Sequence, residues 1–130
     1  MWGNFWVDKC NEVLYVQPGT ELAAEASAAL AAAYLVFTWA NQTDYANLCL
    51  EHAMELYEFA DKYRGVYHDA IPDVYDFYRS WEGYEDELGW AAIWLFGATQ
   101  QDALLDAAKG PRFEWKKKSY LIHKLWILNI

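Results

Sequence analysis

The chain has 130 residues, of which 55% are hydrophobic and 18% aromatic, and its formal net charge is −9. This composition predicts one folded domain and excludes a disordered polymer. Residues 1–111 hold 18 acidic and 5 basic residues, a net charge of −13, whereas residues 112–130 hold 1 acidic and 5 basic residues, a net charge of +4. Because phosphate binding needs dense Lys and Arg, the acidic body argues against a nucleic acid as partner.

The chain is unusually rich in large aromatic residues, with eight Trp and ten Tyr. A domain of this size exposes much of its surface. The aromatic content therefore indicates a ligand cleft, a missing packing partner or self-association through exposed apolar faces.

The cysteine content and the apolar stretches bear on whether the chain is a disulfide-rich, zinc-binding or membrane protein. Cys10 and Cys49 define neither a disulfide framework nor a zinc site. No signal peptide is recognisable at the N-terminus of this chain. The longest apolar stretch, residues 22–37, is interrupted by Glu25 and Ser27, so no membrane-spanning segment and no membrane partner are expected.

The first predicted helix follows an irregular N-terminal segment, residues 1–17. A Pro-Gly-Thr turn at residues 18–20 precedes an alanine-rich run with high helix propensity, which predicts a helix over about 20–39 with Thr20 as its N-cap. Its small side chains allow close approach from several sides, so we expect it to be an inner helix.

A second helix is expected over about 45–63, with Thr43 as its N-cap. The helix is amphipathic and is expected to lie on the outside. Its apolar side is formed by Cys49, Ala53, Leu56, Ala60 and Tyr63.

A long connection, residues 66–83, contains several aromatic residues and is expected to include a short helix over 73–78. Loops of this length are often functional. Two further helices are expected over about 84–98 and 101–108. An apolar helix followed by an amphipathic one, repeated after about 64 residues, predicts an all-α fold of αα-hairpin repeats, which bury their faces only against stacked neighbours.

Residues 111–130 differ from the rest, with Lys116, Lys117 and Lys118 preceding an apolar, aromatic end. We interpret this segment as a non-homologous basic and apolar tail arising from altered reading at a truncated gene end. A basic amphipathic helix at a membrane surface or partner groove is the other interpretation.

Three segments resemble glycoside hydrolase family 9, whose members are mostly endo-acting cellulases. Residues 18–33 are similar to the family's P-G-S/T-[DE]-x-A-A-E-T-A-A-A-L-A-A-A helix, residues 59–65 match its F-A-D-K-Y-R-G, and residues 77–88 match its F-Y-x-S-W-S-G-Y-x-D-E-L. The sequences of the three segments resemble animal members of the family most closely. The resemblance implies that residues 18–110 are a partial catalytic domain, belonging to an (α/α)6 toroid several times longer than this chain and secreted from the cell.

The activity implied by the resemblance is inverting hydrolysis of internal β-1,4-glucosidic bonds, with a β-1,4-glucan or related polysaccharide as ligand. This reaction needs a carboxylate base and a carboxylic acid roughly 6.5–9.5 Å apart. In the family, the base lies in a D-A-G-D motif and the acid is a Glu near the domain's end. Neither is found here, where Asp69 and Ala70 are followed by Ile71.

We therefore assign no catalytic residue, and whether the chain is an enzyme stays open. The expectation is an internal fragment of an endo-β-1,4-glucanase, inactive by itself, with the remainder of the toroid as its missing partner. The alternatives are a non-catalytic carbohydrate-binding or scaffold protein, and a truncated product without function.

The resemblance implies two sites. The aromatic residues of F-Y-x-S-W line the glucan cleft in the family and correspond to Tyr78 and Trp81, for which hydrophobic packing is the alternative. A structural calcium ion lies beside that cleft. Its ligands correspond to the backbone oxygens of Glu82 and Gly83 and the carboxylates of Asp86 and Glu87.

Calcium is expected to bind weakly. It takes six to eight oxygen ligands, and one further Asp of the family's site has no counterpart here. Glu82 also stands where the family usually has Ser, although a backbone oxygen survives that change. Asp86 and Glu87 are not a catalytic pair, because adjacent helical positions do not face each other. His52, His68 and His123 show no ligand spacing and are expected to be structural or exposed.

Overall fold

A computed structural model describes residues 18–109 of the chain. Within that range all regular elements are helical: α2 (Thr20–Trp39), α3 (Thr43–Lys62), α4 (Tyr67–Ala70), the 3₁₀ helix η1 (Pro72–Val74), α5 (Glu85–Thr99) and α6 (Asp102–Ala108). The helices expected over 20–39, 45–63, 84–98 and 101–108 are confirmed, with ends within two residues of those predicted. The segments 1–17 and 111–130 lie outside the described residues.

The long connection differs from its prediction. Instead of one short helix over 73–78, it contains α4 and η1, which both begin before residue 73. A single turn of each type is stabilised mainly by its surroundings, so helical periodicity in the sequence does not reveal it.

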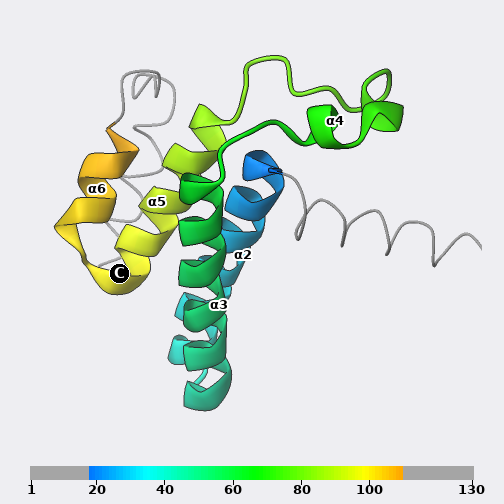
Figure 1. The fold of residues 1–130 in the computed structure, drawn as a ribbon. Helices are drawn as coiled ribbons and strands as arrows, with labels where there is room; N and C mark the ends of the chain where they lie inside the picture. The colour runs from blue at the N-terminus through cyan, green and yellow to red at the C-terminus, as the bar shows by residue number, and fades with distance from the viewer. Residues whose placement is uncertain (1–17, 110–130) are drawn as a thin grey trace, which may run out of the picture.

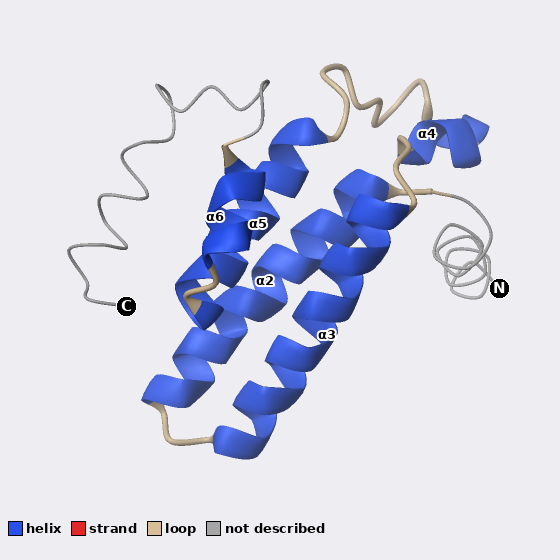
Figure 2. Cartoon of the chain, turned by 60° about the vertical axis from the view of Figure 1, so that its left-hand side comes forward, coloured by secondary structure: helices blue, strands red, loops and turns tan. Residues whose placement is uncertain are grey.

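Helix α2 lies between α3 and α5, and α6 packs on α5. Figure 2 shows α2 and α3 side by side and joined by a short turn at one end, so the pair forms an antiparallel hairpin. Figure 1 shows the long connection crossing from α3 to α5 at the opposite end, near the start of α2. This arrangement confirms the predicted αα pairing and the inner position of α2.

Small side chains form the contact between α2 and α3. On α3 the buried residues are Ala46, Ala53 and Ala60, which recur every seven residues. Ala53 and Ala60 belong to the apolar side expected for this helix and are buried, whereas Tyr63 is half exposed. The expected apolar side is therefore partly wrong. The buried residues of α2 are also mostly alanine, so small side chains lie on both sides of the contact.

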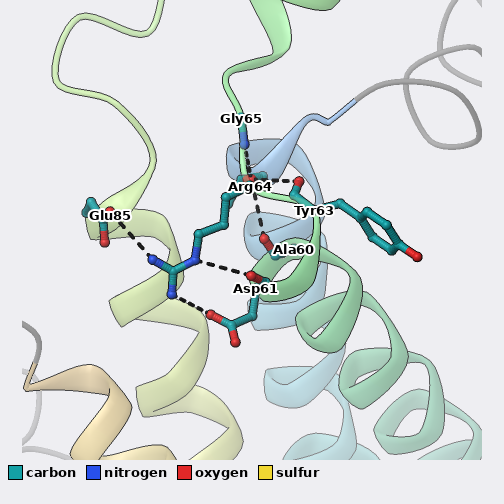
Figure 3. A network of polar contacts seen from close by, with 7 residues as sticks. Ala60, Asp61, Tyr63, Arg64, Gly65 and Glu85 are labelled. Atoms are coloured by element: carbon teal, nitrogen blue, oxygen red, sulfur yellow. Dashed lines mark hydrogen bonds and ion pairs between the residues drawn. The ribbon is translucent and has the colours of Figure 1, made fainter.

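Thr20 ties the start of α2 to the end of α3. It is fully buried and lies inside the helix, where its Oγ1 accepts a hydrogen bond from the N–H of Gly65 (2.9 Å) and donates to the carbonyl of Ala60 (3.3 Å). The N–H of Thr20 also donates to the carbonyl of Gly65 (2.9 Å). Figure 3 shows Ala60 and Gly65 where the chain leaves α3. We call these contacts between Thr20, Ala60 and Gly65 the clasp.

Both predicted N-caps are wrong. Gly19 and Gln42 hold the N-cap positions of α2 and α3, and neither makes a side-chain capping hydrogen bond. For Thr20 the physical reason is the clasp, which uses the hydroxyl group for a tertiary contact.

Helix α2 is long and apolar enough to cross a membrane by length and composition, contrary to the expectation from its interruptions. Its buried polar side chains make tertiary contacts instead. The hydroxyl of Ser27 donates to the carbonyl of Ala53 on α3 (2.7 Å), and Glu21 Oε1 accepts the N–H of Tyr67 (2.9 Å). Such contacts are those of a core helix.

Candidate functional site

The connection between α3 and α5 carries exposed aromatic rings that are close together in the sequence. The side chains of Phe77, Tyr78 and Trp81 are 79%, 76% and 82% exposed. The residues proposed to bind a glucan, Tyr78 and Trp81, therefore do not pack as hydrophobic core within residues 18–109. Exposed aromatic rings on a loop are available for a ligand or for another part of a larger protein.

Arg79 stacks between two rings of this loop. Its guanidinium carbon lies 4.4 Å from the ring centre of Tyr75 and 4.7 Å from that of Trp81. Cation–π contacts at exposed sites contribute about 0.5–1 kcal/mol each. Because the guanidinium lies over the Trp81 ring, one face of the indole is covered and the opposite face is left for a ligand. Sequence reasoning missed Arg79, although the aromatic residues on both sides of it were a usable signal.

A tight turn follows Trp81 and leads into α5. The hydroxyl of Ser80 donates a short hydrogen bond to the carbonyl of Gly83. Gly83 has a φ of +90°, a conformation that side chains with a Cβ rarely adopt, although a Cβ there would meet no other atom within 4 Å. Glycine is therefore required at this position for its backbone freedom rather than for space.

His68 anchors this turn to the helical body. The ring is 8% exposed and its Nδ1 accepts a hydrogen bond from the N–H of Ser80 (3.3 Å). The rings of Tyr67 and Tyr75 contact it edge-on, with centres at 6.0 and 5.4 Å. His68 is therefore structural, one of the two roles expected for it, but the sequence did not reveal its link to Ser80.

The first turn of α5 carries the carboxylates predicted to bind calcium. Glu87 Oε2 is buried and has no hydrogen-bond partner. Burial, and then the neighbouring carboxyl group of Asp86, raise the pKa of Glu87 to about 7. Glu21 of α2 also contributes, because its negative charge disfavours ionisation of Glu87.

Glu21 is a second buried carboxyl group near this site. Burial raises its pKa, and its Oε2 also lacks a hydrogen-bond partner. The sequence suggested only that Glu21 would favour the helix dipole of α2, so its proximity to Glu87 was missed. Two buried carboxyl oxygens without donors are chemically suited to a proton or a cation.

The calcium ligands proposed from the sequence are only partly assembled. Asp86 and Glu87 adjoin on α5, but Gly83 already accepts a hydrogen bond from Ser80. Residues 18–109 contain no group of three or more His, Cys, Asp or Glu placed to hold a metal ion. The unsatisfied oxygen of Glu87 fits a cation, whereas the set of donors is smaller than calcium prefers.

Arg64 connects the end of α3 to the start of α5 beside this acidic turn. Its guanidinium binds the Asp61 carboxylate at 2.6 Å and lies 3.7 Å from the Glu85 carboxylate. Figure 3 shows Arg64 reaching between the two elements. Such half-exposed pairs contribute at most about 1 kcal/mol, so the contact orients the turn more than it stabilises the fold.

Comparison with known proteins gives a family match. The model of glycosyl hydrolase family 9 matches residues 5–127. This match extends past residue 110, so the boundary proposed there stays a prediction.

Several curated relatives are endoglucanases. Endoglucanase 5 of Oryza sativa subsp. japonica and an endoglucanase of Dictyostelium discoideum are each 52% identical over 91 residues, or 70% of this chain. Endoglucanase A of Bacillus pumilus is 48% identical over 100 residues, or 75% of the chain. The matched region spans only 17%, 13% and 15% of the three relatives, respectively.

Solved structures show the same likeness. The endoglucanase of the termite Nasutitermes takasagoensis matches 71% of this chain with a TM-score of 0.65 and 49% identity. The catalytic domain of Clostridium thermocellum CelT matches 71% of the chain with a TM-score of 0.61 and 34% identity. The matches cover 21% and 18% of those two chains. The described helices therefore form part of an (α/α)6 barrel, as predicted.

Proposed function

The chain belongs to glycosyl hydrolase family 9, and on this premise we propose that residues 18–109 supply part of the glucan-binding surface of an endo-β-1,4-glucanase. The observation that carries the proposal is the exposure of Tyr78 and Trp81 on a loop held by hydrogen bonds. Aromatic faces bind the apolar C–H surfaces of sugar rings, so neighbouring exposed rings provide a platform for a β-1,4-glucan.

Binding and hydrolysis are separate steps in this proposal. Inverting hydrolysis needs one carboxylate to activate water and one carboxylic acid to protonate the leaving oxygen. The family's D-A-G-D motif is not found in the chain, so the base has no assigned residue here. A platform without that motif also suits the second candidate, a non-catalytic carbohydrate-binding protein. Secretion and the remainder of the toroid as partner stay predictions.

The aromatic platform can be tested by calorimetry with a soluble β-1,4-glucan oligosaccharide such as cellohexaose. Trp81→Ala and Tyr78→Ala are each expected to weaken binding about tenfold, because burial of a large apolar side chain contributes roughly 1.5 kcal/mol or more. Trp39→Ala is the matched control, since this ring is 87% exposed but lies at the end of α2. Equal losses in all three variants, or no loss at Trp81, would contradict the proposal.

A weak calcium site beside the platform is part of the same proposal. Asp86 and Glu87 would supply carboxylate oxygens, and Glu82 and Gly83 would supply backbone oxygens. When bound, the ion would neutralise the acidic first turn of α5 and satisfy Glu87 Oε2. With these donors alone, the expected dissociation constant is about millimolar or weaker.

The acidic turn predicts a pH-dependent stability. Since the pKa of Glu87 is about 7 in the folded chain and 4.5 in its ordinary range, the folded chain holds this proton more tightly. The stabilisation is fully present below about pH 4.5 and is lost as the pH rises through about 7. Glu87→Gln should flatten this part of the stability curve, measured as melting temperature against pH. Glu51→Gln, on the exposed side of α3, should leave it unchanged.

Calcium should act on the same curve. Calcium binds the ionised form of a carboxyl group, and Glu87 is ionised above about pH 7. In that range millimolar calcium should raise the melting temperature of the wild type and of Glu51→Gln. It should have little effect on Glu87→Gln or Asp86→Ala. Unchanged calcium stabilisation in these two variants would place the ion elsewhere.

A further inference from the structure

The hydrogen bond from the Ser80 N–H to His68 joins α4 to the turn that precedes α5. His68 belongs to the short helix α4, and Ser80 lies twelve residues later, directly before Trp81. Since the N–H of Ser80 is a donor, Nδ1 of His68 must be the unprotonated nitrogen of a neutral ring. A ring protonated on both nitrogens offers no acceptor at this position.

Two routes lead from His68 to the Trp81 ring. Along the backbone, Ser80 is fixed by His68 and closes the turn to Gly83 through its hydroxyl. Through the side chains, His68 packs edge-on against Tyr75, and Arg79 then stacks between Tyr75 and Trp81. Both routes depend on the position of the buried imidazole.

We propose that His68 is a positioning residue for the aromatic platform and makes its affinity for β-1,4-glucan depend on pH. This inference rests on the proposed glucan-binding function. Neutral His68 holds Ser80 and so orients Trp81. Protonation removes the acceptor for the Ser80 N–H, which frees the turn and weakens binding.

Charged groups around His68 strengthen this effect. Asp69 of α4 places its Oδ1 3.8 Å from Nε2, and Glu21 of α2 interacts electrostatically with the ring. Tyr67 and Tyr75 contact the ring by their edges, and the Arg79 guanidinium lies over Tyr75. A protonated imidazole is attracted to the two carboxylates and repelled by the Ser80 N–H, so protonation disfavours the contact with the turn.

The first arm of the test follows the Ser80 amide of the 130-residue chain by NMR between about pH 5 and 8, the range in which histidine side chains change charge. The Ser80 amide shift should change with pH in step with the ring resonances of His68. It should lose that dependence in His68→Asn, whose side-chain oxygen can accept at the Nδ1 position without titrating. His52→Asn is the matched control, because His52 is exposed and bonded to Glu55. A Ser80 shift unrelated to His68 would overturn the proposal.

The second arm measures cellohexaose affinity by calorimetry at about pH 5 and pH 7.5. Wild type and His52→Asn should bind about fivefold more weakly at the lower pH, the effect of losing one ordinary hydrogen bond. His68→Asn should bind equally at both values, and His68→Leu should bind weakly at both. The same pH dependence in His68→Asn as in wild type would overturn the proposal.

The two arms separate this inference from the function on which it rests. If cellohexaose binds at neither pH, the proposed glucan-binding function of the chain fails, and with it the pH-dependent affinity. The NMR arm still decides whether His68 positions Ser80. If cellohexaose binds but the Ser80 amide is insensitive to His68, the function stands and the positioning role fails. The NMR arm on wild type also remains decisive if His68→Leu does not fold.

Discussion

Replacing Gly65 by alanine is expected to lower the free energy of unfolding by about 1–3 kcal/mol. A Cβ at this position would lie 2.7 Å from Cγ and 2.8 Å from Cβ of Pro18, which is closer than real Cβ atoms come to other atoms. The proline ring is rigid and is part of the chain that enters α2, so the backbone must move. That movement strains both hydrogen bonds between Gly65 and Thr20.

Gly97→Ala provides the matched control, because a Cβ there meets nothing within 4 Å and the residue lies inside α5. Alanine has the higher helix propensity, so this variant should gain about 0.5–1 kcal/mol. Urea unfolding followed by circular dichroism would measure both changes. The steric account fails if Gly65→Ala is as stable as wild type, or if both variants lose stability equally.

The second large effect concerns catalysis. The purified 130-residue chain is expected to release no reducing sugar from soluble cellulose derivatives above a blank. A glucan held on Tyr78 and Trp81 has no assigned base and acid on opposite sides of its scissile bond. Stacking contributes affinity, whereas inversion requires two positioned carboxyl groups. A full-length endoglucanase of the family, assayed in the same way, is the positive control.

Asp86 and Glu87 supply the sharpest check on this prediction. They follow Glu82 and Glu85 on the C-terminal side of Trp81, and the raised pKa of Glu87 resembles that of a general acid. If the pure chain cleaves the substrate, and Asp86→Ala or Glu87→Ala abolishes cleavage, the chemistry lies in this turn and our assignment is wrong. Activity that survives both substitutions would instead point to other carboxyl groups of the chain.

Local features of the sequence were sufficient to predict the long helices and the family. Alanine-rich periodicity over residues 20–39 and amphipathic periodicity over 45–63 encode helices by propensity and by the spacing of apolar side chains. The motifs at residues 59–65 and 77–88 are contiguous, so they can be recognised without a structure. The proposed roles of Tyr78 and Trp81, and of the calcium ligands, follow from the same motif and stay predictions.

Only the tertiary structure assigned roles to residues whose partners are distant in the chain. Thr20 is of a residue type that favours N-cap positions, but its hydroxyl contacts Ala60 and Gly65, which are 40 and 45 residues away. The charge of Glu21 raises the pKa of Glu87 only because α2 packs against α5. Helix propensity is a property of a few neighbouring residues, whereas a buried polar side chain acquires its role from whichever group folding places beside it. For that reason the sequence determined the helices, and the packing of those helices decided the clasp, the His68 contact and the acidic turn.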